Sequence, residues 1–232
     1  MIDLSQSKSQ VEFVTNFQEL IAKNFNGETN AIGLKRKLRG DFSELVNQIK
    51  FKENILELKE NDLLKLELSK EGQIARSIIL NDIVLLKELG ASPVLNLIKN
   101  YERDDALPFF PTDVYSFHVD RSPIPTDTFL CTYYGESSDI IPNSQAIQKI
   151  LIPEIRNELK QIYSGTEDEF DSFLSEFFFD LHYQVKPKSS PYNLGVGNLW
   201  KLAVDYPRSI VSPCIHRAPK EVSGRKRLLL IC

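Results

Sequence analysis

Two of the three histidines in this 232-residue chain stand in patterns that favour metal binding. His118 lies two residues before Asp120 in the run Ser-Phe-His-Val-Asp, and side chains two apart in a β-strand point to the same face of the sheet. Such a pair can supply two ligands to one metal ion, although it also occurs on ordinary strand surfaces. His216, near the C-terminus, offers a third ligand. We therefore predict that His118, Asp120 and His216 form a metal site.

Two imidazoles and one carboxylate are the ligand set of the non-haem Fe(II) oxygenases, in which three positions on the metal stay open for cosubstrate and oxygen. Taken alone, His216 is equally compatible with a core histidine bonded to a backbone carbonyl. The remaining histidine, His182, follows a run rich in phenylalanine at helical spacing. We predict a structural or surface role for His182 and no contact with the metal.

Arg225 and Arg227 follow His216 by about ten residues and begin the last β-like run. Strand alternation places both arginines on one face with Leu229 and Ile231, which indicates that this face is partly interior. A buried guanidinium can form a bidentate pair with a carboxylate, whereas an exposed pair of arginines would be a solvated basic cluster. Alternation cannot choose between the two arginines. We favour Arg227, because it stands further into the apolar run.

Four short motifs occur in one order along the second half of the chain. They are His-x-Asp at 118–120, Thr-Tyr-Tyr-Gly at 132–135, Gly-Asn-Leu-Trp-Lys-Leu at 197–202 and His-Arg-Ala-Pro at 216–219. Over roughly residues 113–232 the chain resembles the Fe(II)/2-oxoglutarate-dependent oxygenases, and most of all a bacterial branch of unknown function. It departs from that branch at Ala218, where serine is usual, and in the run 122–129, which lacks the usual arginine.

The resemblance implies a double-stranded β-helix, a jelly-roll barrel, with Fe(II) held by the three predicted ligands. It also implies 2-oxoglutarate as cosubstrate, with its far carboxylate on Arg227 or Arg225 and a hydroxyl from Thr132, Tyr133 or Tyr134. The implied activity is a dioxygenase that hydroxylates a small molecule or peptide and releases succinate. The alternative is a cupin-like barrel that binds a metal or ligand without oxidising anything. A third hypothesis is a partner-binding protein that acts through its N-terminal helices.

The elements that must position these residues predict an α+β fold with a jelly-roll core. We expect residues 1–105 to be mostly helical and to pack on a metal-binding core at 106–232, with a helical insertion at 144–183, as one integrated domain. The periodicity predicts helices over residues 10–24, 41–49, 73–89, 92–100, 144–164 (broken by Pro153) and 168–183. It predicts strands over residues 30–38, 114–119, 128–135, 198–204, 209–216 and 225–232.

Composition excludes several classes of protein. An apolar content of 42% and a charged content of 26% are those of an ordinary globular chain. The net charge of −4 argues against nucleic-acid binding, and no run approaches the roughly 18 apolar residues of a membrane span. Three cysteines without a Cys-x-x-Cys motif, and a start without a signal peptide, predict a cytoplasmic protein. The oligomeric state is left open.

Overall fold

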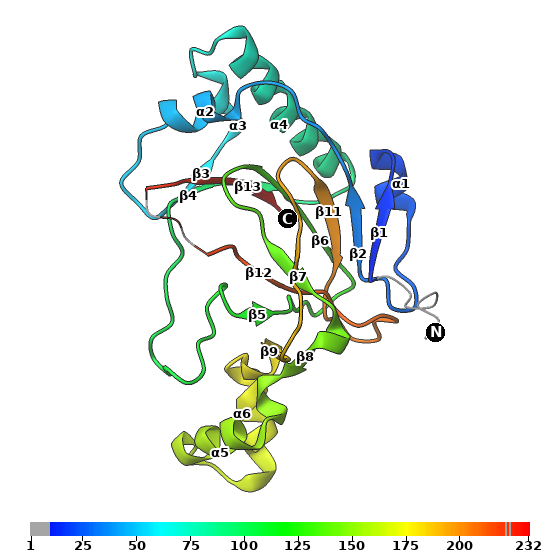
Figure 1. Cartoon of the computed structure of the whole chain (residues 1–232), viewed down its shortest axis with the longest axis vertical. Coiled ribbons are helices and arrows are strands. Elements are labelled where there is room, and N and C mark those ends of the chain that lie inside the picture. Colours follow the sequence, from blue (N-terminus) through cyan, green and yellow to red (C-terminus); the bar gives the residue numbers. More distant parts are fainter. Residues whose placement is uncertain (1–9, 221, 223) are drawn as a thin grey trace.

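A computed structural model describes residues 10–220, 222 and 224–232 of the chain. Two β-sheets, one of them curled into a half-barrel, form the centre of a mixed helix-and-strand fold, with one group of helices at each end (Figure 1). The candidate ligands lie on the smaller sheet, and the candidate arginines belong to the last strand of the larger sheet and the turn before it.

The larger sheet has seven strands in the order β1-β2-β11-β6-β13-β4-β3. Its first pair, β1 and β2, is parallel, and its other pairs are antiparallel. In this order along the sheet the strands are Val11–Val14, Ala31–Leu34, Leu199–Ala203, Asp127–Tyr134, Arg227–Ile231, Val94–Ile98 and Ile55–Leu58.

The smaller sheet has six antiparallel strands in the order β10-β7-β12-β5-β9-β8. In this order the strands are Tyr192–Asn193, Asp139–Ile141, Ile215–Arg217, Phe117–His118, His182–Val185 and Ala146–Gln148. Its short strands alternate between the inter-sheet space and a separate apolar cluster on the other face.

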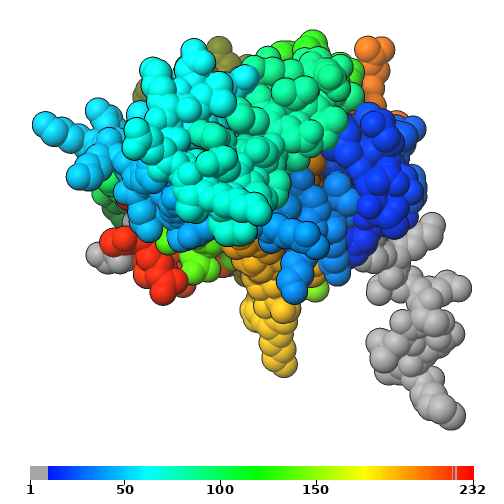
Figure 2. Space-filling model, turned by 90° about the horizontal axis from the view of Figure 1, so that it is seen from above, coloured from blue at the N-terminus to red at the C-terminus, as the bar shows by residue number. Residues whose placement is uncertain are grey.

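Four helices precede the first motif residue: α1 (Phe17–Ala22), α2 (Phe42–Gln48), α3 (Glu60–Leu64) and α4 (Lys70–Glu88). Their apolar sides share one buried cluster with the outward side chains of β6 and β13, so they cover the outer face of the larger sheet. Seen from above, α3 and α4 lie in the broad cyan to blue-green surface (Figure 2). Helix α4 ends before Gly90, whose φ of +89° favours glycine.

The insertion forms a small layer of its own below the sheets (Figure 1). Its helices are α5 (Pro153–Ile162) and α6 (Phe170–Glu176), with four short 3₁₀ turns at Asn143–Gln145, Lys149–Leu151, Glu167–Glu169 and Phe179–Leu181. Leu159, Phe170, Leu174 and Phe179 bury their side chains around Phe110, which comes from the loop before β5. The insertion therefore packs directly on the segment that leads to His118.

Several predicted elements are wrong. Residues 10–24 form β1 and α1 in place of one helix, because Val11–Val14 pairs with Ala31–Leu34. Residues 92–100 form strand β4, since the run Val94–Ile98 is flanked by β3 and β13 and buries most of its length. The expected mostly helical N-terminal part instead contributes four of the seven strands, β1 to β4, to the larger sheet.

The predicted helix over 144–164 is also only partly correct. Ala146–Gln148 forms strand β8, which pairs with β9, and Pro153 begins α5 at its first turn instead of breaking it.

Within the described part of the chain, no helix combines the length and apolar character that crossing a membrane requires.

Candidate metal centre and buried arginine

The smaller sheet brings the three predicted ligands together. His118 on β5 lies directly opposite His216 on β12, and Asp120 follows β5 by two residues. One ligand atom from each of the three side chains lies within 4.8 Å of the other two. Two metal–ligand bonds of about 2.1 Å at right angles place their ligand atoms about 3 Å apart, so the three side chains must rotate inward to contact one ion from one side.

Strand alternation explains why these three side chains share a face. Phe117, Val119 and Ile215, their neighbours in sequence, point away and pack in the apolar cluster on the other side of the sheet. His118, Asp120 and His216 consequently point into the space between the sheets. The spacing in the sequence thus places the carboxylate and the imidazole as predicted.

Backbone carbonyls orient both imidazole rings. The Nδ1 atom of His118 lies 2.8 Å from the carbonyl oxygen of Ser116, and that of His216 lies 3.2 Å from the carbonyl oxygen of Cys214. Because a carbonyl can only accept, each Nδ1 carries the proton and donates it. The Nε2 lone pairs are left to bind a metal, and this second contact fixes each ring as it does in established metal sites.

Asp120 is held in its ionised form. Its Oδ2 accepts a hydrogen bond of 2.6 Å from the Thr128 hydroxyl, and its Oδ1 lies 3.7 Å from Nε2 of His216. Burial alone would raise the pKa of this carboxyl, but the His216 ring, the Thr128 hydroxyl and the His118 ring hold it below its ordinary value. The carboxylate is therefore negative at neutral pH.

His118 is held neutral. Burial and the neighbouring His216 ring lower the pKa of His118 to about 4, against the pull of its carbonyl partner and Asp120. A neutral imidazole beside an ionised carboxylate is the protonation state that a divalent cation requires. The three residues therefore fit a divalent metal ion in donor type and spacing, and His118 and Asp120 also fit it in protonation.

His182 lies beside this group without joining it. Its side chain is buried on β9, and its ring centroid is 5.8 Å from that of His118 and 6.1 Å from that of Phe110. Among the described residues, its Nδ1 has no hydrogen-bond partner. Because the side chain is buried, the predicted surface alternative is wrong. Burial, His118 and Lys149 lower the pKa of His182 to about 3.

The three ligand candidates line a cavity of about 210 Å³ between the sheets, which we call the metal cavity. Arg227 lines the same cavity from the larger sheet. The remaining lining residues are largely apolar, and three of them are polar: Ile55, Asn96, Ile98, Tyr101, Val114, Leu130, Ser138, Ala218, Leu229 and Ile231. The cavity thus has one wall of candidate metal ligands and one cationic wall.

The guanidinium of Arg227 is buried among hydroxyl groups. It donates to Thr132 at 3.0 Å, to Ser138 at 2.8 Å and to Tyr101 at 3.4 Å, and its Nε has no partner in the described part of the chain. No carboxylate of the described residues lies within ion-pair distance of it, and burial lowers the pKa of the group. A buried cation without a counter-charge is costly, so this site fits an anionic ligand.

The other predicted cosubstrate residues take different positions. Arg225 precedes β13, so strand alternation does not extend to it, and its exposed side chain pairs with Glu136 at 3.2 Å. Of the three hydroxyls suggested for the far carboxylate, only that of Thr132 lies beside Arg227, from which it accepts a hydrogen bond. Tyr134 packs against the helix-covered cluster, and the Tyr133 hydroxyl donates to Asp82, so both lie on the far side of the sheet.

Sequence reasoning missed two hydroxyl groups at this site. Ser138 precedes β7 and Tyr101 follows β4, and neither stands in a motif that the sequence makes visible. Their role depends on which strands flank β13. Tyr101 could have been found if residues 94–98 had been recognised as a strand. The preceding Ser-Pro pair instead favours a helix there.

The two low histidine pKa values predict that the metal-free protein loses stability in acid. The pKa of His182 is about 3 when folded and 6.5 in its unperturbed state, so between these values the unfolded chain binds more protons and stability falls as pH falls. His182→Leu should flatten this loss by up to about 1.4 kcal/mol per pH unit. Urea unfolding at several pH values between 6.5 and 4, without metal, measures the slope of the unfolding free energy against pH.

Gln184→Leu, on the same strand, is the control and should leave this slope as in the wild type. An equal effect of both variants would contradict the assignment of the acid sensitivity to His182.

Comparison with known proteins provides no family for the chain. Neither family models, nor curated proteins, nor solved structures gave a match. The functional argument therefore rests on the residues of the metal cavity.

Proposed function

We propose that the chain is a non-haem Fe(II)/2-oxoglutarate-dependent oxygenase that hydroxylates a small molecule or peptide. One observation carries the proposal: a two-histidine, one-carboxylate group and a buried arginine without a counter-charge line the same 210 Å³ cavity. The first is the ligand set of this enzyme class. The second is suited to a planar carboxylate at the opposite wall.

The strand pairing supports a double-stranded β-helix. Eight strands pair as a long hairpin rolled onto itself, with the first pairing the last: β4 with β13, β5 with β12, β6 with β11, and β7 with β10. Rolling such a hairpin divides it between two facing sheets, which is how a jelly roll is built. In this arrangement the ligands lie on the second and seventh strands of the roll and Arg227 lies on the eighth.

Each wall of the cavity has a separate task. His118, Asp120 and His216 hold Fe(II) by one face and leave its other positions accessible from the cavity. Arg227, supported by Thr132 and Ser138, binds the far carboxylate of 2-oxoglutarate. When bound, iron and 2-oxoglutarate supply the oxidising chemistry that consumes O₂, releases succinate and CO₂, and hydroxylates a C–H bond.

The apolar residues between the two walls limit water in the cavity. Leu130, Leu229 and Ile231 project from β6 and β13 into this space. A dry cavity strengthens the pairing of Arg227 with a carboxylate, and it also protects a reactive site from side reactions with water. These side chains therefore suit both cosubstrate binding and oxidation.

Succinate formation tests the proposal. Protein reconstituted anaerobically with Fe(II) should convert 2-oxoglutarate to succinate when air and ascorbate are added, even without the main substrate. Zn²⁺-loaded protein is the matched control, since the same ligands hold an ion that cannot change its oxidation state. If the protein binds Fe(II) yet forms no more succinate than the zinc form, the oxygenase is excluded and the non-oxidising cupin-like barrel takes its place.

A further inference from the structure

A second cavity adjoins the metal cavity. It has a volume of about 540 Å³ and shares Ile55, Tyr101 and Val114 with the metal cavity. We call it the outer cavity; its other lining residues are Glu53, Asn54, Asn100, Glu102, Thr112 and Asp113. Because three residues border both spaces, a molecule seated in the outer cavity lies next to the proposed iron site.

The outer cavity is acidic. Three of its lining residues carry carboxylates, and none is a lysine, arginine or histidine. Asp113 is engaged by the loop, since it accepts from the backbone nitrogen of Tyr115 at 3.0 Å and lies 3.9 Å from Arg103. Glu102 has no hydrogen bond or ion pair with any described residue. The exposed Glu53 carboxylate accepts from the backbone nitrogens of Glu53 itself and of Lys52, and these contacts together with the charge of Lys99 lower its pKa. No cationic side chain of the described residues lies at ion-pair distance from either glutamate, so both carboxylates can pair with a ligand.

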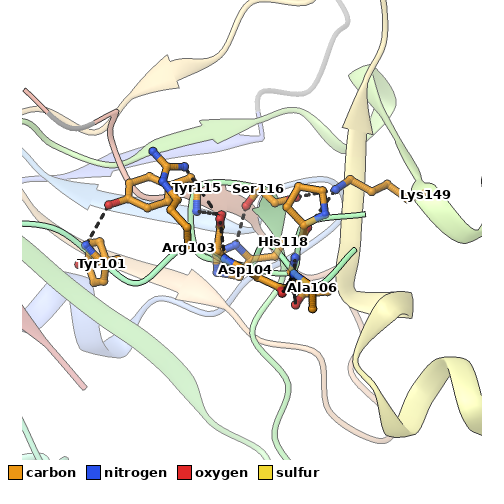
Figure 3. Close-up of polar contacts among 11 residues, drawn as sticks. Tyr101, Arg103, Asp104, Ala106, Tyr115, Ser116, His118 and Lys149 are labelled. Atoms are coloured by element: carbon orange, nitrogen blue, oxygen red, sulfur yellow. Dashed lines mark hydrogen bonds and ion pairs between the residues drawn. The ribbon is translucent and has the colours of Figure 1, made fainter. Parts of the chain in front are cut away.

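The wall of the outer cavity is braced before any ligand binds (Figure 3). The Tyr115 hydroxyl accepts a hydrogen bond of 2.9 Å from the Tyr101 backbone, and the Arg103 guanidinium lies 3.6 Å from the centre of the Tyr115 ring. Asp104 accepts from the backbone of Thr112 at 3.1 Å. The same segment continues through Ser116, whose carbonyl orients His118. The wall of the outer cavity and the candidate metal ligand His118 therefore belong to one continuous segment of the chain.

The two cavities carry opposite charge. In the inner one, the Arg227 side chain is buried and its Nε lacks a partner among the residues that the structure describes, which favours an anion. In the outer one, Glu53 and Glu102 repel anions and attract cations. A dicarboxylate cosubstrate and a cationic substrate would therefore be sorted to two adjoining cavities. Ile55, Val114 and the Tyr101 ring line both cavities and provide apolar contacts where they meet.

We propose that the outer cavity binds the substrate of this enzyme, and that the substrate is an organic cation on an aliphatic chain, such as a lysine side chain. The proposal rests on the proposed oxygenase function and adds the substrate class to it. The carboxylates of Glu53 and Glu102 hold the cationic group, and the aliphatic chain lies against Ile55 and Val114 toward the iron. A carbon of that chain is then the one presented for hydroxylation.

The test compares two probes that differ only in charge, N-acetyl-lysine amide and N-acetyl-norleucine amide. Binding to the Zn²⁺-loaded protein with 2-oxoglutarate is followed by NMR, and succinate formation by the Fe(II) protein is followed separately. The variant Glu53→Gln/Glu102→Gln should bind the lysine probe about tenfold more weakly, since each exposed charge pair contributes modestly. The control Glu154→Gln/Glu158→Gln removes the same charge from exposed positions on α5 and should bind it as the wild type does.

The outcomes separate the two proposals. Preference for lysine that is lost only in the outer-cavity variant, with succinate formation intact, supports the inference. Equal binding of both probes, or equal loss in both double variants, overturns the cation site even where succinate still forms. Selective lysine binding without any succinate overturns the oxygenase and leaves the cation site.

Discussion

Replacing Asp120 or His118 with alanine should abolish tight Fe(II) binding, whereas replacing His182 with leucine should leave it intact. Each of the first two changes removes one of only three protein ligands. Loss of a group that merely orients a ligand weakens metal binding about 10- to 100-fold, so loss of a ligand itself should cost at least about 100-fold. Anaerobic titration with Fe(II), followed by metal analysis of the separated protein, should give about one ion per chain for the wild type only.

His182→Leu is the matched control because His182 lies beside His118 and is equally sheltered. Its ring is tilted at 5.8 Å from that of His118, yet none of its atoms joins the ligand group. The substitution keeps a similar volume and removes both ring nitrogens, one of which has no partner within the described ranges of the chain. A wild type that binds no divalent ion defeats the metal site. Binding that survives His216→Ala but not His182→Leu would instead reassign the third ligand.

The local part of the site could be predicted from the sequence. His118 and Asp120 stand two residues apart, and strand parity alone places them on one face. His216 could be added only because its motif suggested a ligand; what brings it opposite His118 is the pairing of β5 with β12, strands far apart in the chain. Parity also placed Arg227, Leu229 and Ile231 on one face, and all three line the metal cavity.

The rest depends on strand pairing that local signals do not contain. Ser92 and Pro93 are typical of a helix start, but Val94–Ile98 is a strand because β13 and β3 pair with it on both sides. Because the sequence predicts a helix here, it offers no reason to place Tyr101, which follows this strand, in contact with Arg227. Likewise the run 10–24 has apolar spacing that suits a helix. Its first part is a strand because it pairs with the edge of β2.

Arg227→Leu should abolish 2-oxoglutarate binding and leave Fe(II) binding largely unchanged. A charge-assisted hydrogen-bond pair contributes roughly 2 to 3 kcal/mol, which corresponds to at least about thirtyfold weaker binding. The measurement is a titration of the anaerobic Fe(II) protein with 2-oxoglutarate, followed by its visible charge-transfer band. Arg225→Leu is the matched control: two residues away, it removes the same charge from an exposed ion pair with Glu136 and should leave the affinity unchanged.

Stability distinguishes a ligand-binding role of Arg227 from a structural one. A structural arginine would be paired in the folded protein, and its loss would destabilise the fold by several kcal/mol. Arg227 instead has three hydroxyl partners and no carboxylate among the described residues. Its removal relieves a buried unpaired charge, so the ligand-free variant should unfold in urea within about 1–2 kcal/mol of the wild type. By contrast, 2-oxoglutarate at 100 times its Kd should stabilise only the Fe(II)-loaded wild type, by about 2.7 kcal/mol. A variant that is strongly destabilised, or one still stabilised by 2-oxoglutarate, would show that the carboxylate is held elsewhere.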